Sequence, residues 1–277
     1  MNQLHKVSGW KLFIKTVIAR AYPRVIGQQR EKSWMFFDIF LPLLGLSAYI
    51  FVYRAIKAPE EFVGFVVIGG AMTAFWMNVL WSMSSQLYWE KEQGNLALYI
   101  IAPAPLMAIL LGMALGGMVA TLLRAAVIIL IGSWLFHVQF MVTQMGMLIL
   151  VFLVTMVALY GLGMMSSSLY LLLSREAWHI SNLAQEPIYL LSGFYFPVKN
   201  LGFWVALSAS IIPLTLGLDA MRQLAFPSTA SFGFLDVRVE RWGLIFLSIV
   251  FLGLARYLLA YMEKLAIREG RLTETRR

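Results

Sequence analysis

The chain has 277 residues, of which 60% are hydrophobic and only 13% are charged. A soluble domain is normally about 45–50% apolar and about 25% charged, so this composition excludes an ordinary soluble protein and indicates an integral membrane protein. The net charge of +8 does not indicate nucleic-acid binding. The basic residues concentrate near the two ends of the chain and flank apolar runs, where membrane topology and anionic headgroups account for them.

The N-terminal segment, residues 1–34, is basic and is expected to lie in the cytoplasm. Apolar residues recur at helical spacing over residues 10–21, and Lys11, Lys15 and Arg20 lie off that stripe. This pattern predicts an amphipathic helix in the headgroup layer, and a simple membrane-flanking anchor is the alternative. The segment lacks a short apolar core followed by a small-residue cleavage site, so we do not expect a removable signal peptide.

Residues 35–262 contain six apolar runs, each near or above the roughly 20 residues that cross a bilayer. The runs are continuously apolar rather than alternating, which favours helices over a barrel. The sequence therefore predicts an all-α membrane protein with six transmembrane helices. The expected spans are residues 35–53, 62–87, 106–136, 145–173, 178–196 and 242–262.

The stretch at residues 89–105, between the second and third spans, is the internal segment best suited to contact a soluble protein. It opens on charged residues, bends at a Gly-Asn pair, returns to apolar residues and ends at two prolines, which disfavour helix in the residue before them. A short amphipathic helix across the membrane face fits this pattern, and an ordinary cytoplasmic loop is the alternative. Its candidate contact residues are Glu90, Lys91, Glu92, Gly94, Leu96 and Leu98.

Residues 197–239 form an unusual segment before the last span. Pro197, Pro213 and Pro227 break it, and it is too polar for a span yet too apolar for a free loop. Two short helices that dip back into the membrane would explain both properties, because backbone at that depth must be buried in protein. A basic tail, residues 263–277, follows the last span.

The distribution of lysine and arginine predicts the topology. Six spans place both ends of the chain on one side, and both ends are rich in basic residues, whereas residues 137–144 contain none. We therefore expect a plasma-membrane protein. By the positive-inside rule both ends of the chain, and residues 89–105 with them, are expected in the cytoplasm.

The chain carries no recognisable catalytic or metal-binding motif. It has no GxxxxGK[ST], HExxH or GxSxG pattern and no cysteine, and its histidines, His5, His137 and His179, are scattered. We therefore expect no enzyme activity and no bound cofactor. If transport is active, the nucleotide chemistry belongs to another chain.

Three charged positions within or near the spans call for partners. Arg124 lies inside the third span, where an unpaired charge costs at least about 2.5 kcal/mol. It either lines a substrate pathway or forms a structural pair, for which Glu186 is the candidate. Asp219 and Arg222 are three residues apart, so we expect them to pair on one helical face and stabilise a re-entrant turn, with substrate contact as the alternative.

Gly112 and Gly116 form a GxxxG pattern in the third span. This spacing permits two membrane helices to approach closely, and some helices dimerise through it. The pattern is frequent by chance, so it supports close helix packing more strongly than a dimer through this face.

Residues 191–197, Leu-Ser-Gly-Phe-Tyr-Phe-Pro, are followed at short spacing by residues 212–215, Ile-Pro-Leu-Thr, and then by Asp219 and Arg222. This series resembles the membrane subunit of type-2 ATP-binding-cassette exporters, whose pattern reads roughly LSGxxFP, a short gap, then PLTYxxDxxR. Leu216 stands where that family usually has tyrosine. The motif residues are Ser192, Gly193, Phe196, Pro197, Pro213, Leu214, Thr215, Asp219 and Arg222.

The resemblance implies a fold and an assembly. Such proteins have six spans, an amphipathic interface helix before them, a cytoplasmic coupling helix after span two and outer re-entrant helices after span five. Two permease subunits, here expected to be a homodimer, work with two cytoplasmic ATPases that bind ATP and Mg. Residues 89–105 would be the coupling helix, with Glu90 and Glu92 as ion-pair partners of basic ATPase residues and Leu96 and Leu98 as apolar anchors.

The resemblance also implies export of an amphipathic or hydrophobic substrate, such as a drug-like compound or a lipid. One alternative keeps the architecture but changes the substrate to a lipid-linked glycan or polysaccharide. A second alternative, of another class, is a membrane scaffold or sensor subunit that transports nothing.

Overall fold

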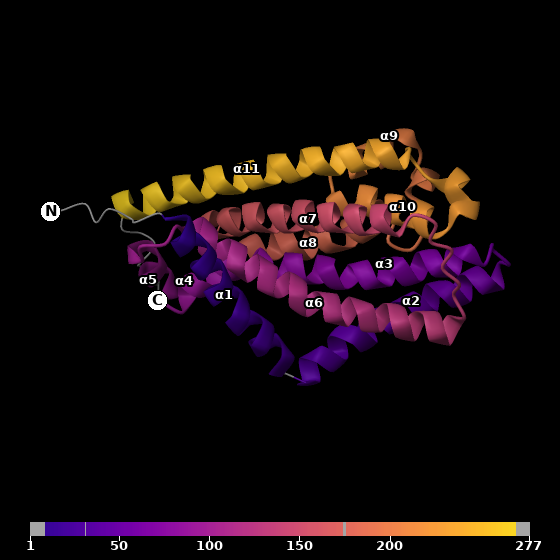
Figure 1. Ribbon diagram of the computed structural model, residues 1–277, viewed down its shortest axis with the longest axis horizontal. Coiled ribbons are helices and arrows are strands. Elements are labelled where there is room, and N and C mark those ends of the chain that lie inside the picture. The colour runs from indigo at the N-terminus through magenta and orange to yellow at the C-terminus, as the bar shows by residue number, and fades with distance from the viewer. Residues whose placement is uncertain (1–8, 31, 174–175, 270–277) are drawn as a thin grey trace.

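The computed structural model describes residues 9–30, 32–173 and 176–269, and in this part of the chain every regular element is a helix. Most of the long helices lie along one axis, the first two are inclined to it, and short helices lie at the two ends of the bundle (Figure 1). In chain order the elements are α1 (Trp10–Arg30), α2 (Lys32–Ala55), α3 (Glu61–Met77), the π-helix η1 (Asn78–Met83), α4 (Gln86–Glu92), α5 (Asn95–Ile101), α6 (Leu106–Phe136), α7 (Met145–Leu173), α8 (Glu176–Leu191), the 3₁₀ helix η2 (Val198–Leu201), α9 (Phe203–Ala209), α10 (Pro213–Ala225), the 3₁₀ helix η3 (Pro227–Phe232) and α11 (Val237–Glu269).

Five helices of the described chain are long and apolar enough to cross a membrane. The third and fourth predicted spans coincide with α6 and α7. Pro105 is extended immediately before α6, and His137 adopts the left-handed conformation that ends it. The five candidate spans of the described chain are Met35–Ala55, Glu61–Glu92, Leu106–Phe136, Met145–Tyr170 and Val237–Leu265.

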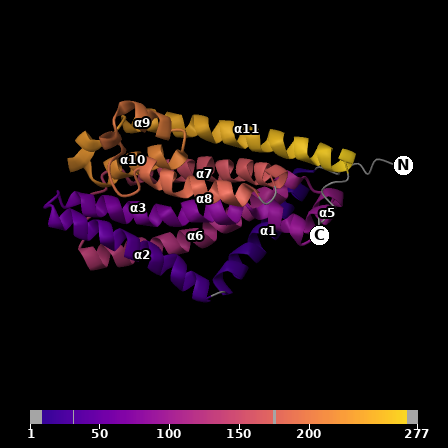
Figure 2. The same ribbon diagram turned by 180° about the vertical axis from the view of Figure 1, so that it is seen from behind.

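The fifth predicted span, residues 178–196, differs from the observed helix. α8 has only 16 residues and lies beside α7 in both views of the bundle (Figures 1 and 2). It ends where Gly193, with a φ of 66°, turns the chain. At 1.5 Å per residue α8 reaches about 24 Å, short of a bilayer core of about 30 Å. A sixth span is counted only if α9 and α10, bent by 112°, form one broken span.

α3 is the central helix of the bundle. In the most apolar stretch of the span that it begins, Glu61–Glu92, 94% of the residues are buried, compared with 11% in the corresponding stretch of Met35–Ala55 in α2. The exposed side chains of α2, including Phe36, Phe40, Leu44 and Phe51, are large and apolar. Such a surface suits hydrocarbon rather than water, so α2 belongs to the periphery of the bundle within the membrane.

The chain continues from α3 into α4 through the π-helix η1. The Ser84 N–H donates to the Val79 carbonyl at 2.9 Å, the wider spacing that defines this helix type. Asn78, at its start, is buried and accepts a hydrogen bond from the Tyr160 hydroxyl at 3.0 Å. A buried polar group needs such a partner, so this bond fixes η1 against α7.

The Gly112–Gly116 pattern forms a close helix crossing within this chain. A Cβ atom at Gly112 would lie 2.5 Å from the Val17 carbonyl oxygen, and one at Gly116 would lie 2.7 Å from the Ala21 carbonyl oxygen. Both carbonyls belong to α1. The small residues therefore let the amphipathic helix predicted in the N-terminal segment lie directly on α6.

The two ends of the bundle are formed by different elements. The short helices α4 and α5 lie at one end, with the first turn of α1 and the last turns of α11, and α9 and α10 lie at the other end (Figures 1 and 2). α11 runs from Val237 to Glu269 and is longer than the predicted span at residues 242–262. Residues 1–8 of the basic N-terminal segment and residues 270–277 of the basic tail lie outside the described residues.

Candidate functional site

The predicted contact stretch, residues 89–105, contains the end of α4, a turn and α5. Gly94 has a φ of 78° and separates the two short helices. After α5 the chain becomes extended at Ala102, and Pro103 and Pro105 lead into α6. A short helix thus lies between the second and third spans, at the end of the bundle that also holds the start of α1 (Figure 1).

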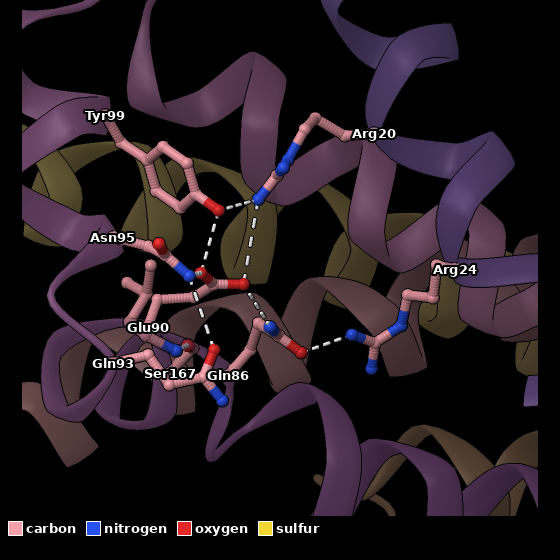
Figure 3. A network of polar contacts seen from close by, with 9 residues as sticks. Arg20, Arg24, Gln86, Glu90, Gln93, Asn95, Tyr99 and Ser167 are labelled. Carbon is pink, nitrogen blue, oxygen red and sulfur yellow. Dashed lines mark hydrogen bonds and ion pairs between the residues drawn. The ribbon is translucent and has the colours of Figure 1, made fainter. Parts of the chain in front are cut away.

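Glu90 is the centre of a polar network in this stretch (Figure 3). Its carboxylate accepts hydrogen bonds from the Tyr99 hydroxyl at 2.7 Å, the Gln86 amide at 2.8 Å and the Asn95 amide at 3.1 Å. The Arg20 guanidinium lies 3.6 Å from the same carboxylate. Glu90 is 8% exposed, so this charge is buried and compensated within the chain.

Two arginines of α1 complete the network. Arg20 also donates to the Tyr99 hydroxyl, and its guanidinium lies 4.4 Å from the centre of the Tyr99 ring. Arg24 donates to Gln86 Oε1 and Ser82 Oγ, and burial lowers the pKa of its guanidinium below the ordinary value. Arginine stays charged in proteins, so both bonds are charge-assisted. α1 is therefore fastened to α4 and α5.

The sequence interpretation missed this role of α1. Arg20 was expected in the headgroup layer, off the apolar stripe, but it points toward Glu90 (Figure 3). The usable signal was that Arg20 and Arg24 are four residues apart and so lie on one helical face. That face required an acidic or polar partner elsewhere in the chain.

The candidate contact residues divide into internal and exposed ones. Glu90 and Leu96 were expected to be an exposed ion-pair partner and an exposed anchor, but both are buried, because they pack α4 and α5 onto the bundle. Glu92 and Gly94 are exposed, Lys91 is half-buried, and Leu98 is 59% exposed. Two further apolar side chains that we did not single out, Trp89 and Ile101, are 46% and 73% exposed.

Arg222 joins the two halves of the motif at the other end of the bundle. Its guanidinium donates to the carbonyl oxygens of Gly193 and Phe194, both at 2.6 Å, and of Phe65 at 3.0 Å and Phe196 at 3.3 Å. Arg222 is 2% exposed. The positive charge thus satisfies three carbonyl groups of the loop after α8, which has no regular secondary structure, and ties that loop to α3 through Phe65.

Asp219 and Arg222 act on each other electrostatically, but they do not form the predicted ion pair at contact distance among the described residues. Asp219 instead accepts from the Phe234 N–H at 2.8 Å and from the Gln223 amide at 2.9 Å, and so holds the chain that precedes α11. Helical spacing allowed the pair, but the long arginine side chain reaches the loop carbonyls. Each residue binds a different neighbouring segment.

The remaining motif residues pack this end of the molecule. A Cβ atom at Gly69 of α3 would lie 1.6 Å from the Phe194 carbonyl oxygen, so the loop lies directly on α3. Pro213 is at the first turn of α10, and the Thr215 hydroxyl donates to the Ala209 carbonyl at 2.8 Å across the bend. Ser192, Gly193, Pro197 and Leu214 are buried, and Phe196 is half-buried.

A cavity of about 680 Å³ lies between α2, α3, α6 and α8. Arg124 lines it but pairs with Asp38 of α2 rather than with the predicted partner Glu186. Arg124 also donates to the Gln28 carbonyl at 3.4 Å. Glu186 lines the same cavity from α8, because that helix lies on the opposite wall. Within the described part of the chain, no group of three or more His, Asp or Glu side chains is placed to hold a metal ion.

Comparison with known proteins identifies the class. Residues 14–226 match the family described as the ABC-2 type transporter, which covers most of the chain and contains both the α1–α5 network and the motif around Arg222. The chain belongs to this family, and its apolar spans make it a multi-pass membrane permease.

The chain is also similar to a protein of Escherichia coli K12 named "Probable multidrug ABC transporter permease YbhR", with 25% identity over 135 residues. The same figures hold for the protein of that name in E. coli O157:H7. The aligned region is 49% of this chain and 36% of the relative, so the chain spans about a third of the length of the curated relatives that it matches.

Proposed function

We propose that this chain is the permease subunit of an ATP-binding-cassette exporter that moves an amphipathic or hydrophobic substrate, such as a drug-like compound or lipid, out of the cell. Membership of the ABC-2 type transporter family and the similarity to a multidrug permease support the proposal. The ATP and Mg bind a separate ATPase subunit. The working assembly contains two permease chains, as a homodimer, and two cytoplasmic ATPases.

The exposed face of α4 and α5 is the single observation that carries the proposal. Trp89, Leu98 and Ile101 expose apolar surface on the same short stretch as the exposed Glu92, at the end of the bundle that also holds the start of α1. Apolar anchors surrounded by charged groups are typical of protein interfaces. These residues form the proposed docking face, and α4 and α5 act as the coupling helix.

The Glu90 network gives this docking face a mechanical connection. An ATPase that moves α5 also moves α1, because Arg20 and Arg24 hold α1 to the same stretch. α1 lies on α6 at Gly112 and Gly116, so the displacement reaches a membrane span as a rigid-body movement. Both ends of the chain lie in the cytoplasm in this scheme, with the outer re-entrant helices α9 and α10 on the far side.

Co-purification with the ATP-binding-cassette subunit of the neighbouring reading frame tests the proposal. We expect a complex whose ATP hydrolysis is stimulated by exported compounds or lipids. The substitutions Leu98→Glu and Ile101→Glu should abolish complex formation. Val239→Glu, at an exposed apolar position in the first turn of α11 at the opposite end of the bundle, should leave it intact. An ATPase that binds all three variants equally would overturn the docking face.

The choice of cargo is tested in the same complex. Stimulation by lipid-linked glycans but not by drug-like compounds would replace the proposed substrate class. Isolation of the chain as an ATPase-free oligomer from cells that express both proteins would replace export by a scaffold or sensor role.

A further inference from the structure

We infer that the cavity between α2, α3, α6 and α8 binds amphipathic organic cations that carry aromatic rings, with Glu186 as their counter-charge. This inference rests on the proposed function and deepens it by naming the chemical class of the substrate. It is argued from the size, the charge balance and the aromatic lining of the cavity.

The size of the cavity suits a small organic molecule. Its volume is about 680 Å³, and sites for drug-sized ligands generally measure about 300–1,000 Å³. Its walls come from helices that are far apart in the sequence, from Gln28 at the end of α1 to Tyr195 after α8. A relative movement of these helices therefore changes the shape of the cavity.

The charges that line the cavity leave one negative charge uncompensated. Asp38 and Arg124 form an ion pair, so together they are neutral. Glu186 is different: among the described residues no lysine or arginine forms an ion pair with it, and its carboxylate accepts a hydrogen bond from the Gln185 amide at 3.3 Å. Glu186 is exposed at the wall of the cavity, so its carboxylate is accessible to a bound cation and would attract it.

Aromatic side chains surround this negative charge. Tyr49 and Tyr195 line the cavity with their rings stacked, 4.1 Å between centres and 11° between planes. Tyr189 lies one helical turn after Glu186 on α8 and lines the cavity as well. Aromatic faces attract cations and stack on other rings, so a ligand with both features meets both kinds of partner.

A buried oxygen atom adds to the negative potential. Gln28 lines the cavity, and its Oε1 atom is buried without a hydrogen-bond partner in the part of the chain that the structure describes. A carbonyl oxygen is an acceptor and favours a nearby positive charge. An anion of the same size would meet the uncompensated charge of Glu186 and this oxygen, because the Asp38–Arg124 pair is neutral. The cavity therefore discriminates by the sign of the charge.

Two ions of matched size provide the test. The full-length chain in lipid nanodiscs is titrated with tetraphenylphosphonium and with tetraphenylborate, which differ in charge but hardly in shape, and empty nanodiscs give the lipid background. We expect saturable binding of the cation only. Glu186→Gln should weaken cation binding at least about tenfold, because it removes a nearby opposite charge. Glu60→Gln, which removes an exposed carboxylate before α3, should bind like the unaltered chain.

Two further variants keep the test decisive if Glu186→Gln disturbs folding. Glu186→Asp should retain the preference for the cation, and Glu186→Lys should bind the borate instead. Equal affinities for both ions, or a charge preference that is unchanged in Glu186→Lys, would overturn the inference. If the ATPase still co-purifies in that case, the proposed exporter function stands. If cation binding is observed but no ATPase associates, the cation site stands and the proposed export function fails.

Discussion

Arg222 Nη1 lies 2.6 Å from the carbonyl oxygen of Gly193, so the arginine at the end of the motif binds the backbone at its beginning. The two residues are 29 positions apart. Their contact explains why the two halves of the motif occur together: the loop after α8 leaves several carbonyl groups without helical partners, and one guanidinium with five donors can satisfy them. The motif thus has a structural basis in this chain.

Arg222→Lys should strongly destabilise this end of the bundle. Lysine cannot bind several carbonyls in the fixed geometry of a guanidinium, and each lost bond to a charged group is worth about 1.5–3 kcal/mol. The expected result is a clear fall in the thermal unfolding temperature in detergent. Arg238→Lys, at an exposed position near the start of α11, is the matched control and should unfold like the unaltered protein. Equal unfolding temperatures for both variants would contradict the role of Arg222.

A double-mutant cycle measures the connection between α1 and Glu90 of α4. Glu90→Gln and Arg20→Gln each leave a charged partner without compensation, so each variant should be less stable than the parent. The double variant should recover part of the loss, with a coupling energy of about 1 kcal/mol. Denaturant titration of the purified chain gives the four stabilities. Strict additivity would show that the 3.6 Å ion pair does not contribute to stability.

Gly116→Ala should separate α1 from α6. The added methyl group would lie 2.7 Å from the Ala21 carbonyl oxygen, and overpacking of this kind costs about 1–3 kcal/mol. Gly253→Ala is the control, because that glycine of α11 has no atom within 4 Å of an added Cβ, and alanine favours a helix. The measurement is the unfolding temperature together with the oligomeric mass. Loss of a dimer without loss of stability would instead place the GxxxG pattern between subunits.

Asp38 and Arg124 should behave as a pair. Asp38→Asn or Arg124→Gln alone leaves one charge unpaired in the membrane, at a cost of about 2.5 kcal/mol or more. The combined variant removes both charges and should be more stable than the sum of the single effects indicates. Glu186→Gln combined with Arg124→Gln should show simple additivity. The unfolding free energies decide between the two acidic partners, and coupling to Glu186 instead of Asp38 would refute the assigned pair.

The boundaries of α6 and α7 could be predicted from the sequence because local chemistry sets them. Prolines before residue 106 stop the preceding helix, and the apolar runs end in polar links. The amphipathic N-terminal helix was also predictable, since its periodicity is a property of neighbouring residues. The end of the fifth span was predicted less accurately, because the turn at Gly193 depends on a loop that Arg222 holds in place.

The choice of partners was not predictable from a single sequence. For Arg124 only Glu186 was considered as a partner, whereas the packing of α2 against α6 brings Asp38, 86 positions away, to it. Glu90 looked like one of several exposed charges in a polar stretch. The burial of Glu90 depends on an ion pair with Arg20 of α1, and no local sequence pattern predicts that contact. Long-range side-chain pairing is therefore the part of the site that required the structure.

The π-helix at Asn78–Met83 has a mechanical consequence for the polypeptide that contains it. A π-helix holds about one more residue in its turn than an α-helix. If this turn changed between the two forms, the helix beyond it would rotate by about 100°, the angle that one residue contributes to an α-helix. Trp81 and Ser82 sit in this wide turn; both face the cavity, and Ser82 also accepts a bond from Arg24. A rotation at this single point would therefore move the contact between Arg24 of α1 and Ser82 and change the shape of the cavity at the same time.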